Sequence, residues 1–241
     1  MNSISSFKLP LVGLQQTTLL DYPGEEIAST LFIGGCNFNC GYCHNPSLMK
    51  PPKRWVLIGD ILNKLNSRKK WINSIVISGG EPLLYRETIN LIEKLVEEGY
   101  KIKIDTNGGF PEQLEYLLTN KLIDYVAMDL KTIYSRYYEL ASPGVDINIK
   151  TTISLLNKQS STKFEYRTTL CPIFISKGEL KEMATYINQN KVKWYWQQFI
   201  NDRVSNPVFK KVEAYSKEII ILMQNEVQTL FSGQIILRGI D

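Results

Sequence analysis

The sequence has few of the features that mark membrane, secreted or nucleic-acid-binding proteins. Its apolar run near the end, Ile219–Met223, is far too short to cross a bilayer. The stretch Met1–Gln16 has no basic segment followed by an apolar one, so we expect no signal peptide. The net charge is only +4, and we interpret the basic clusters Lys50–Arg54 and Arg68–Lys70 as solvated surface. These absences predict a cytoplasmic protein that binds neither membrane nor nucleic acid.

Cysteine is scarce, and its placement excludes a disulfide framework. Cys36, Cys40 and Cys43 fall within eight residues, whereas Cys171 lies far away. Clustered thiols with CxxxCxxC spacing indicate a metal centre, because the intervening backbone can curl around it. The spacing leaves two metals open. One is zinc, with His44 or Cys171 as a fourth ligand, and the other is a four-iron, four-sulfur (4Fe-4S) cluster whose fourth iron has no protein ligand.

Apolar, β-branched segments alternate with helical patterns along nearly the whole chain. The expected strands are Ile27–Ile33, Ile75–Ser78, Lys101–Asp105, Tyr125–Asp129, Phe164–Thr169, Trp194–Phe199 and Gln234–Leu237. The expected helices are Tyr85–Glu98, one that begins at Pro111, Ile147–Leu156, Leu180–Ile187 and a stretch after Pro207. This alternation predicts an α/β fold with a parallel sheet, either a doubly wound sheet or a partial barrel. No linker interrupts the pattern, so we expect a single domain over residues 1–241.

Polar residues follow the carboxyl end of each predicted strand. In parallel α/β folds, functional residues gather at this edge of the sheet. Arg167 and Gln198 are expected there by strand parity, without an assigned role. The polar segments are Gly34–Pro46, Ser78–Pro82, Asp105–Gly108, Met128–Lys131, Arg167–Thr169 and Gln197–Phe199. Because buried parallel strands are normally apolar, these endings predict one pocket built from six loops.

The cysteine loop, with Tyr42 directly before Cys43, resembles the signature of the radical S-adenosylmethionine (SAM) superfamily. The segment Gly79-Gly80-Glu81 resembles its methionine-binding element. Other segments are similar to those of glycyl-radical-enzyme activases, above all the anaerobic ribonucleoside-triphosphate reductase activating type, with pyruvate formate-lyase activase as a near relative. These segments are Leu20–Gly24, Cys43–Pro46, Asp105–Gly108 and Met128–Lys131. The likeness runs from about Gly13 to Gly239.

This resemblance implies a partial (β/α)6 TIM-like barrel of the radical SAM type. It implies that Cys36, Cys40 and Cys43 hold a 4Fe-4S cluster whose open iron binds SAM. An electron from a flavodoxin or ferredoxin would then cleave SAM to a 5′-deoxyadenosyl radical, under anaerobic conditions. That radical would take a hydrogen from a glycine of a partner glycyl-radical enzyme, for which anaerobic ribonucleotide reductase is expected.

Two other function classes stay open at this point. One is a small radical SAM enzyme that acts on a small molecule, like 7-carboxy-7-deazaguanine synthase. The other is a zinc-binding module without catalytic activity, which would leave the polar residues at the strand ends unexplained. The Asp-Tyr-Pro-Gly and Cys-His-Asn-Pro elements fit an activase better than the synthase.

The resemblance also assigns cofactor contacts to residues at the strand ends, namely Tyr42, Gly79, Gly80, Glu81, Asp105, Thr106, Asp129 and Lys131. Tyr42 fits a buried core position equally well, and Glu81 could simply favour a helix start. Oxygen ligands from Asp105, Thr106 and Asp129 would suit a monovalent cation, Na+ or K+. Lys131 would face the methionine carboxylate.

The remaining metal-ligand types of residue have simpler expected roles. His44 is the only histidine, so a late histidine of pyruvate formate-lyase activase has no counterpart here. This difference favours the reductase activase subgroup, and we expect His44 to be structural. Cys171 is expected to be a lone thiol, which excludes a second cluster held entirely by cysteines.

Overall fold

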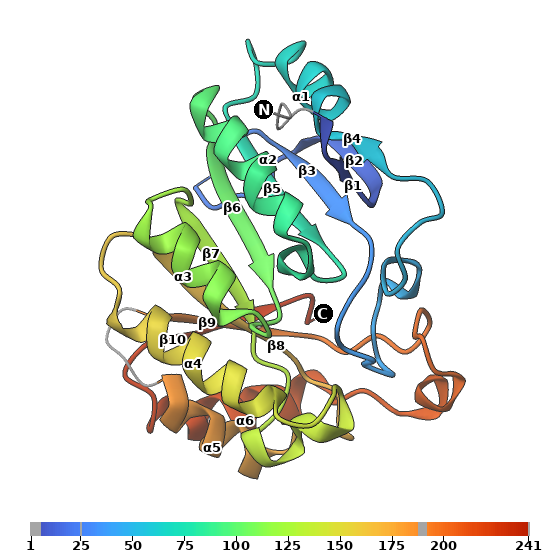
Figure 1. The fold of residues 1–241 in the computed structure, drawn as a ribbon. Helices are drawn as coiled ribbons and strands as arrows, with labels where there is room; N and C mark the ends of the chain where they lie inside the picture. Colours follow the sequence, from blue (N-terminus) through green and yellow to red (C-terminus); the bar gives the residue numbers. More distant parts are fainter. Residues whose placement is uncertain (1–5, 25, 188–191, 241) are drawn as a thin grey trace.

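The fold is a curved, mainly parallel sheet covered by helices on its outer face (Figure 1). The structure is a computed structural model that describes residues 6–24, 26–187 and 192–240. Residues 1–5, part of the stretch in which no signal peptide is expected, lie outside this description. Within it, the main sheet has the strand order β10-β9-β8-β7-β6-β5-β3-β2. These strands are β2 (Leu11–Thr18), β3 (Ala28–Ile33), β5 (Ser74–Gly79), β6 (Lys101–Thr106), β7 (Tyr125–Asp129), β8 (Lys163–Thr169), β9 (Lys193–Gln197) and β10 (Gln234–Arg238).

All pairs from β3 to β10 are parallel, and each strand pairs with the next of these along the chain. In the described ranges the two outer strands, β2 and β10, do not pair with each other, so the sheet does not close. This arrangement confirms the expected partial barrel. The expected strands are present, with ends that differ by at most two residues.

Helices follow the strands and bury one apolar face each against the sheet. In α2, for example, Ile89, Ile92 and Leu95 are buried, as the helical spacing predicts. Pro111 begins its helix as expected. The helices are α1 (Ile58–Asn66), α2 (Arg86–Glu97), α3 (Pro111–Thr119), α4 (Val145–Lys158), α5 (Lys177–Ile187) and α6 (Lys217–Gln228), with the short 3-10 helices η2 (Pro46–Leu48), η3 (Pro82–Leu84), η4 (Tyr134–Glu139) and η5 (Pro207–Lys211).

The sequence patterns missed the elements around the first parallel strand. The edge strand β2 runs antiparallel to β3 and leaves much of its length exposed, so it has no continuous apolar run. Two very short strands, β1 (Lys8–Leu9) and β4 (Val56–Leu57), pair with each other beside helix α1. The helical stretch expected after Pro207 is divided in two: the short helix η5 comes first, and the long helix α6 begins at Lys217, where the Ser216 hydroxyl accepts a hydrogen bond from the Ile219 backbone amide.

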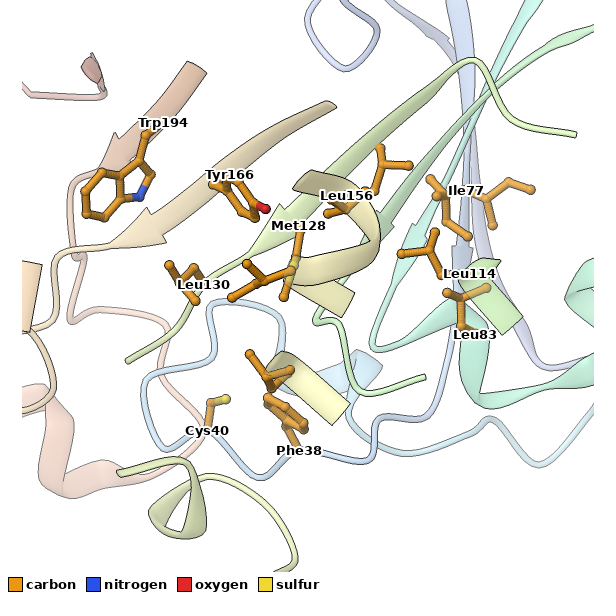
Figure 2. Packing of buried hydrophobic residues seen from close by; sticks show 14 of the residues in the cluster. Phe38, Cys40, Ile77, Leu83, Leu114, Met128, Leu130, Leu156, Tyr166 and Trp194 are labelled. Atoms are coloured by element: carbon orange, nitrogen blue, oxygen red, sulfur yellow. The ribbon is translucent and has the colours of Figure 1, made fainter. Parts of the chain in front are cut away.

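The apolar core continues from the sheet to the cysteine loop. Figure 2 shows Phe38 and Cys40 facing Leu130 and Met128, which are fully buried at the end of β7. The Phe38 ring also meets the Tyr137 ring edge to face at 6.0 Å. This packing holds the loop down on the carboxyl edge of the sheet. Among the helices of the described ranges, none is both long and apolar enough to traverse a bilayer.

Candidate active site

The loop after β3, residues 34–46, carries three cysteines over the carboxyl edge of the sheet. Backbone hydrogen bonds fix it to the chain that follows, from Gly35 N to Leu48 O (2.8 Å) and from Cys36 N to Met49 O (3.2 Å). Within the loop, Cys43 N donates to Cys40 O at 3.1 Å. The Cys36, Cys40 and Cys43 thiols line one pocket as a result.

The pocket brings together most of the residues expected at the strand ends. It is lined by Cys36, Phe38, Cys40, Tyr42, Cys43, His44, Asn45, Met49, Gly79, Gly80, Asp129, Lys131, Thr169 and Gln197. Glu81, Asp105 and Thr106 do not line it. Among the described residues, no three histidine, cysteine or acidic side chains are arranged to hold a single metal ion.

The loop after β5 approaches the cysteine loop so closely that only glycine fits. Gly79 has φ +140°, and a Cβ there would lie 2.0 Å from the Ile33 carbonyl oxygen. A Cβ on Gly80 would lie 2.2 Å from Gly35 O and 2.5 Å from Leu48 O. Glycine therefore lets two backbones touch at the pocket wall. The Gly80 and Glu81 amides use this contact to donate to Ile33 O and Gly35 O.

Glu81 lies outside the pocket lining and joins the loops that follow β5 and β6. Its fully buried carboxylate accepts hydrogen bonds from the amides of Leu83 (3.0 Å) and Asn107 (2.6 Å) and from the Thr106 hydroxyl (3.0 Å). Burial raises the pKa of Glu81 to about 7, against the lowering effect of these donors. The carboxylate is thus committed to joining the loops after β5 and β6, and its side chain does not reach the pocket.

Two carboxylates beside the pocket are neutralised by the protein's own cations. Asp105 contacts Lys103 Nζ at 2.5 Å and an Arg167 guanidinium nitrogen at 3.3 Å. Asp129 accepts from Arg167 Nε at 2.8 Å and lies 3.2 Å from Lys131 Nζ. The result is a row of alternating charges across strands β6, β7 and β8, with Arg167 between the two aspartates.

The dependence of the free energy of unfolding on pH in the acid range should show the contribution of this row of charges. Burial favours a higher pKa for Asp105, but Arg167 and Lys103 outweigh it and hold the pKa well below its usual range. An acid whose pKa is lowered by folding stabilises the fold above its unfolded pKa of about 3.9, and this contribution is lost as the pH falls further. We expect the free energy of unfolding to fall below pH 4, with a smaller fall in Asp105→Asn, as measured by urea titration. Asp202→Asn, at an exposed carboxylate, should retain the wild-type slope; an identical slope in Asp105→Asn would contradict the assignment.

Three further residues at or near the pocket, Tyr42, Asn107 and Gln198, agree with the sequence predictions to different degrees. Tyr42 is buried and packs against Phe174 at 5.4 Å, so it serves the core as well as the pocket wall. Asn107, not assigned a role from sequence, donates from its amide toward Cys36 Sγ at 3.7 Å. The expectation for Gln198 was wrong, because its amide donates to Tyr215 O and Gln197 lines the pocket instead.

Comparison with known proteins places this geometry in a family. The radical SAM superfamily model matches residues 30–186. A Methanocaldococcus jannaschii protein described as a candidate glycyl-radical enzyme activating enzyme is 34% identical over 205 residues, which cover 83% of this chain and 84% of that protein. The pyruvate formate-lyase-activating enzyme of Staphylococcus aureus is 32% identical over 137 residues, 51% of this chain and 53% of that one.

Two further matches bear on the fold and on the alternative function. The 7-carboxy-7-deazaguanine synthase of Haemophilus influenzae is 30% identical over 178 residues, which cover 67% of this chain and 76% of that enzyme. The crystal structure of QueE from Escherichia coli superimposes with a TM-score of 0.57 at 12% identity, over 96% of this chain and 94% of that one, which is a likeness of fold alone. The chain thus belongs to the radical SAM superfamily, as an enzyme of the glycyl-radical-enzyme activating group.

Proposed function

We propose that Cys36, Cys40 and Cys43 hold the 4Fe-4S cluster that radical SAM enzymes use. The observation that carries the proposal is that all three cysteines line one pocket together with the glycine edge formed by Gly79 and Gly80. In such a cluster each thiolate binds a different iron, so the sulfurs need not converge on a single point. A structural zinc ion takes four converging protein ligands, and among the described residues not even three histidine, cysteine or acidic side chains are grouped around one point.

The pocket also suits the amino-acid end of SAM. Gly79 and Gly80 line the pocket without side chains, so a ligand can lie against their backbone. The row of charges around Arg167 has three cationic and two anionic members, which leaves one excess positive charge. Lys131 is the cation of the row that lines the pocket. We assign it to the carboxylate of the methionine moiety.

A Na+ or K+ ion does not fit the proposed ligands as they stand. The Thr106 hydroxyl donates to Glu81 and so points away from the two carboxylates, as expected for neighbours on one strand. Asp105 and Asp129 already face Arg167, Lys103 and Lys131, which leaves no net negative charge to attract a further cation. We propose that Lys103, Lys131 and Arg167 supply the positive charge beside the two aspartates that an alkali ion was expected to supply.

When bound, the cluster and SAM would supply one-electron cleavage of the sulfonium carbon–sulfur bond, and the 5′-deoxyadenosyl radical released with methionine would take the hydrogen of a partner's glycine. The chain's part is to orient the cofactor through Lys131 and the glycine edge and to exclude water with Phe38 and Tyr42, which are buried at the pocket wall. We propose anaerobic ribonucleotide reductase as the partner, a flavodoxin or ferredoxin as electron donor, a cytoplasmic location and a single domain over residues 1–241.

Anaerobic turnover with dithionite and SAM tests this function. We expect slow formation of 5′-deoxyadenosine without a partner, and a glycyl radical, seen by electron paramagnetic resonance, when anaerobic ribonucleotide reductase is added. Lys131→Ala should weaken SAM binding at least about tenfold while iron content stays unchanged, because Lys131 supplies charge and no thiolate. Exposed Lys150, paired with Asp146 on α4, gives the control Lys150→Ala, which should bind SAM normally.

The similarity to 7-carboxy-7-deazaguanine synthase supports one second candidate function, a radical SAM enzyme that acts on a small molecule. If 5′-deoxyadenosine forms, every glycyl-radical partner stays free of radical and a purine-precursor substrate is consumed, the enzyme acts on a small molecule. Absence of 5′-deoxyadenosine from the fully reconstituted enzyme would contradict both functions.

A further inference from the structure

A groove rich in positive charge lies beside the cysteine loop. We name it the basic groove; it has a volume of about 1080 Å³ and is formed by β1, β4, helix α1 and the chain before β4. Its charged residues are the cations Lys8, Lys53, Arg54 and Lys64, against the single acid Asp60, and Trp55 lies among them. The groove shares none of its lining residues with the cysteine pocket.

The charge of the basic groove is not neutralised by the protein. Some exposed lysines elsewhere form ion pairs, such as Lys101 with Glu26, Lys150 with Asp146 and Lys177 with Glu226, so what distinguishes the groove is that its four cations lie together. In the part of the chain that the structure describes, none of the four groove cations forms an ion pair with a carboxylate. Such a concentration of like charge attracts acidic surfaces and speeds their encounter.

Two aromatic rings connect the basic groove with the cysteine loop. Trp55, which is 37% exposed, meets the Tyr85 ring edge to face with centroids 5.3 Å apart. The Tyr85 hydroxyl in turn lies against Gly35, where a Cβ would come within 2.2 Å of it. Gly35 directly precedes Cys36. A molecule in the groove can thus contact Trp55 while only one further side chain separates it from the backbone at the first thiol.

We propose that the basic groove is the docking surface for a small acidic electron-carrier protein, which delivers the electron on the Cys36 side of the site. This inference rests on the proposed function, because reductive cleavage of SAM consumes one electron from outside in each turnover. The carrier loses that electron, and the sulfonium carbon–sulfur bond accepts it. Electron-transfer complexes are small, short-lived and steered by charge, as an open groove with unpaired cations requires. The groove and the pocket share no lining residue, so the proposed docking surface is separate from the pocket lining.

The test compares two reductants of one reconstituted enzyme. A photoreduced flavodoxin must dock, whereas dithionite needs no docking surface; cluster bleaching in a stopped-flow instrument reports both rates. We expect the triple variant Lys53→Glu, Arg54→Glu, Lys64→Glu to lower the flavodoxin rate at least about tenfold at low salt, with an unchanged dithionite rate. The matched control reverses three lysines at the opposite, amino-terminal ends of the strands, Lys121, Lys163 and Lys193, and should leave both rates unchanged.

The salt dependence of the wild-type enzyme gives a measurement that needs no variant. Its flavodoxin rate should fall between 20 and 300 mM NaCl as charges are screened, by roughly tenfold. A rate independent of salt, or an equal loss in the control variant, would overturn the proposal. Retention of a short nucleic acid by the wild type but not by the groove variant, at equal flavodoxin rates, would assign the groove to nucleic acid instead. If dithionite itself gave no SAM cleavage, the proposed function would fail rather than the docking surface.

Discussion

Alanine in place of Cys36, Cys40 or Cys43 is expected to remove most of the iron and acid-labile sulfide, each of which should reach about four per chain in the wild type after anaerobic reconstitution. In the proposed cluster each thiolate would bind a different iron, so the loss of one would leave two irons without a protein ligand. Cleavage of SAM should become undetectable in all three variants. Iron and sulfide analysis with electron paramagnetic resonance of the reduced protein measures both effects.

Cys171→Ala is the matched control. Cys171 is fully buried in the loop after β8 and does not line the pocket, so its loss should leave the iron content unchanged. Iron retained at about four per chain in Cys43→Ala would contradict the assignment of three ligands. Stoichiometric zinc that survives reconstitution with iron would contradict the cluster itself.

Gly80→Ala is expected to cost about 3 kcal/mol of the free energy of unfolding and to lower the cluster content as well. The added methyl group would press on two backbone carbonyls, Gly35 O and Leu48 O, neither of which can rotate away as a flexible side chain could. The cysteine loop must therefore move as a unit, and Cys36 moves with it. Urea unfolding and iron analysis of the same preparation follow the two effects.

Gly178→Ala shows what the same substitution does without crowding. Gly178 is exposed in the first turn of α5, and a Cβ there meets only Ser176 Oγ at an ordinary 3.6 Å. Alanine is also the better helix former, so stability should stay the same or rise by up to about 1 kcal/mol. Equal free energies of unfolding for Gly80→Ala and Gly178→Ala would contradict the tight packing of the glycine edge.

The fold could be predicted from the sequence wherever strands are buried on both faces. Segments such as Ile75–Ser78 and Tyr125–Asp129 are nearly continuous apolar runs that end in polar residues, so both their existence and their ends are visible. The edge strand β2 was missed because an exposed strand needs no such run. Its residues Gln15 and Gln16 face solvent, and only the pairing with β3 makes the segment a strand.

The site was predictable as a set of loops but not in the direction of each side chain. The cysteine spacing and the glycine pair pointed to residues that do share a pocket. Strand parity should have separated Thr106 from Asp105, since neighbours on a strand point to opposite faces. At β9 the two buried tryptophans, Trp194 and Trp196, fix the parity and turn Gln197 toward the pocket.

Long-range partners account for the rest of the difference. Glu81 accepts a hydrogen bond from the Asn107 amide, and Arg167 lies between two aspartates. Both arrangements depend on contacts between segments distant in sequence. A local motif carries no record of such pairings. The sequence therefore indicated which residues gather at this edge of the sheet more reliably than which groups each of them contacts.

The hydrogen bonds that hold the cysteine loop come partly from residues late in the sequence, which matters during synthesis of the chain. All three site cysteines belong to the first 43 residues, yet the Ser205 hydroxyl and the Asn206 amide are the groups that donate to Cys40 O (2.7 Å) and Gly41 O (3.0 Å). A chain emerging from the ribosome thus exposes its thiols long before residues 205 and 206 exist to clamp them. The cysteine loop therefore reaches its final packing only after residues 205 and 206 have been synthesised.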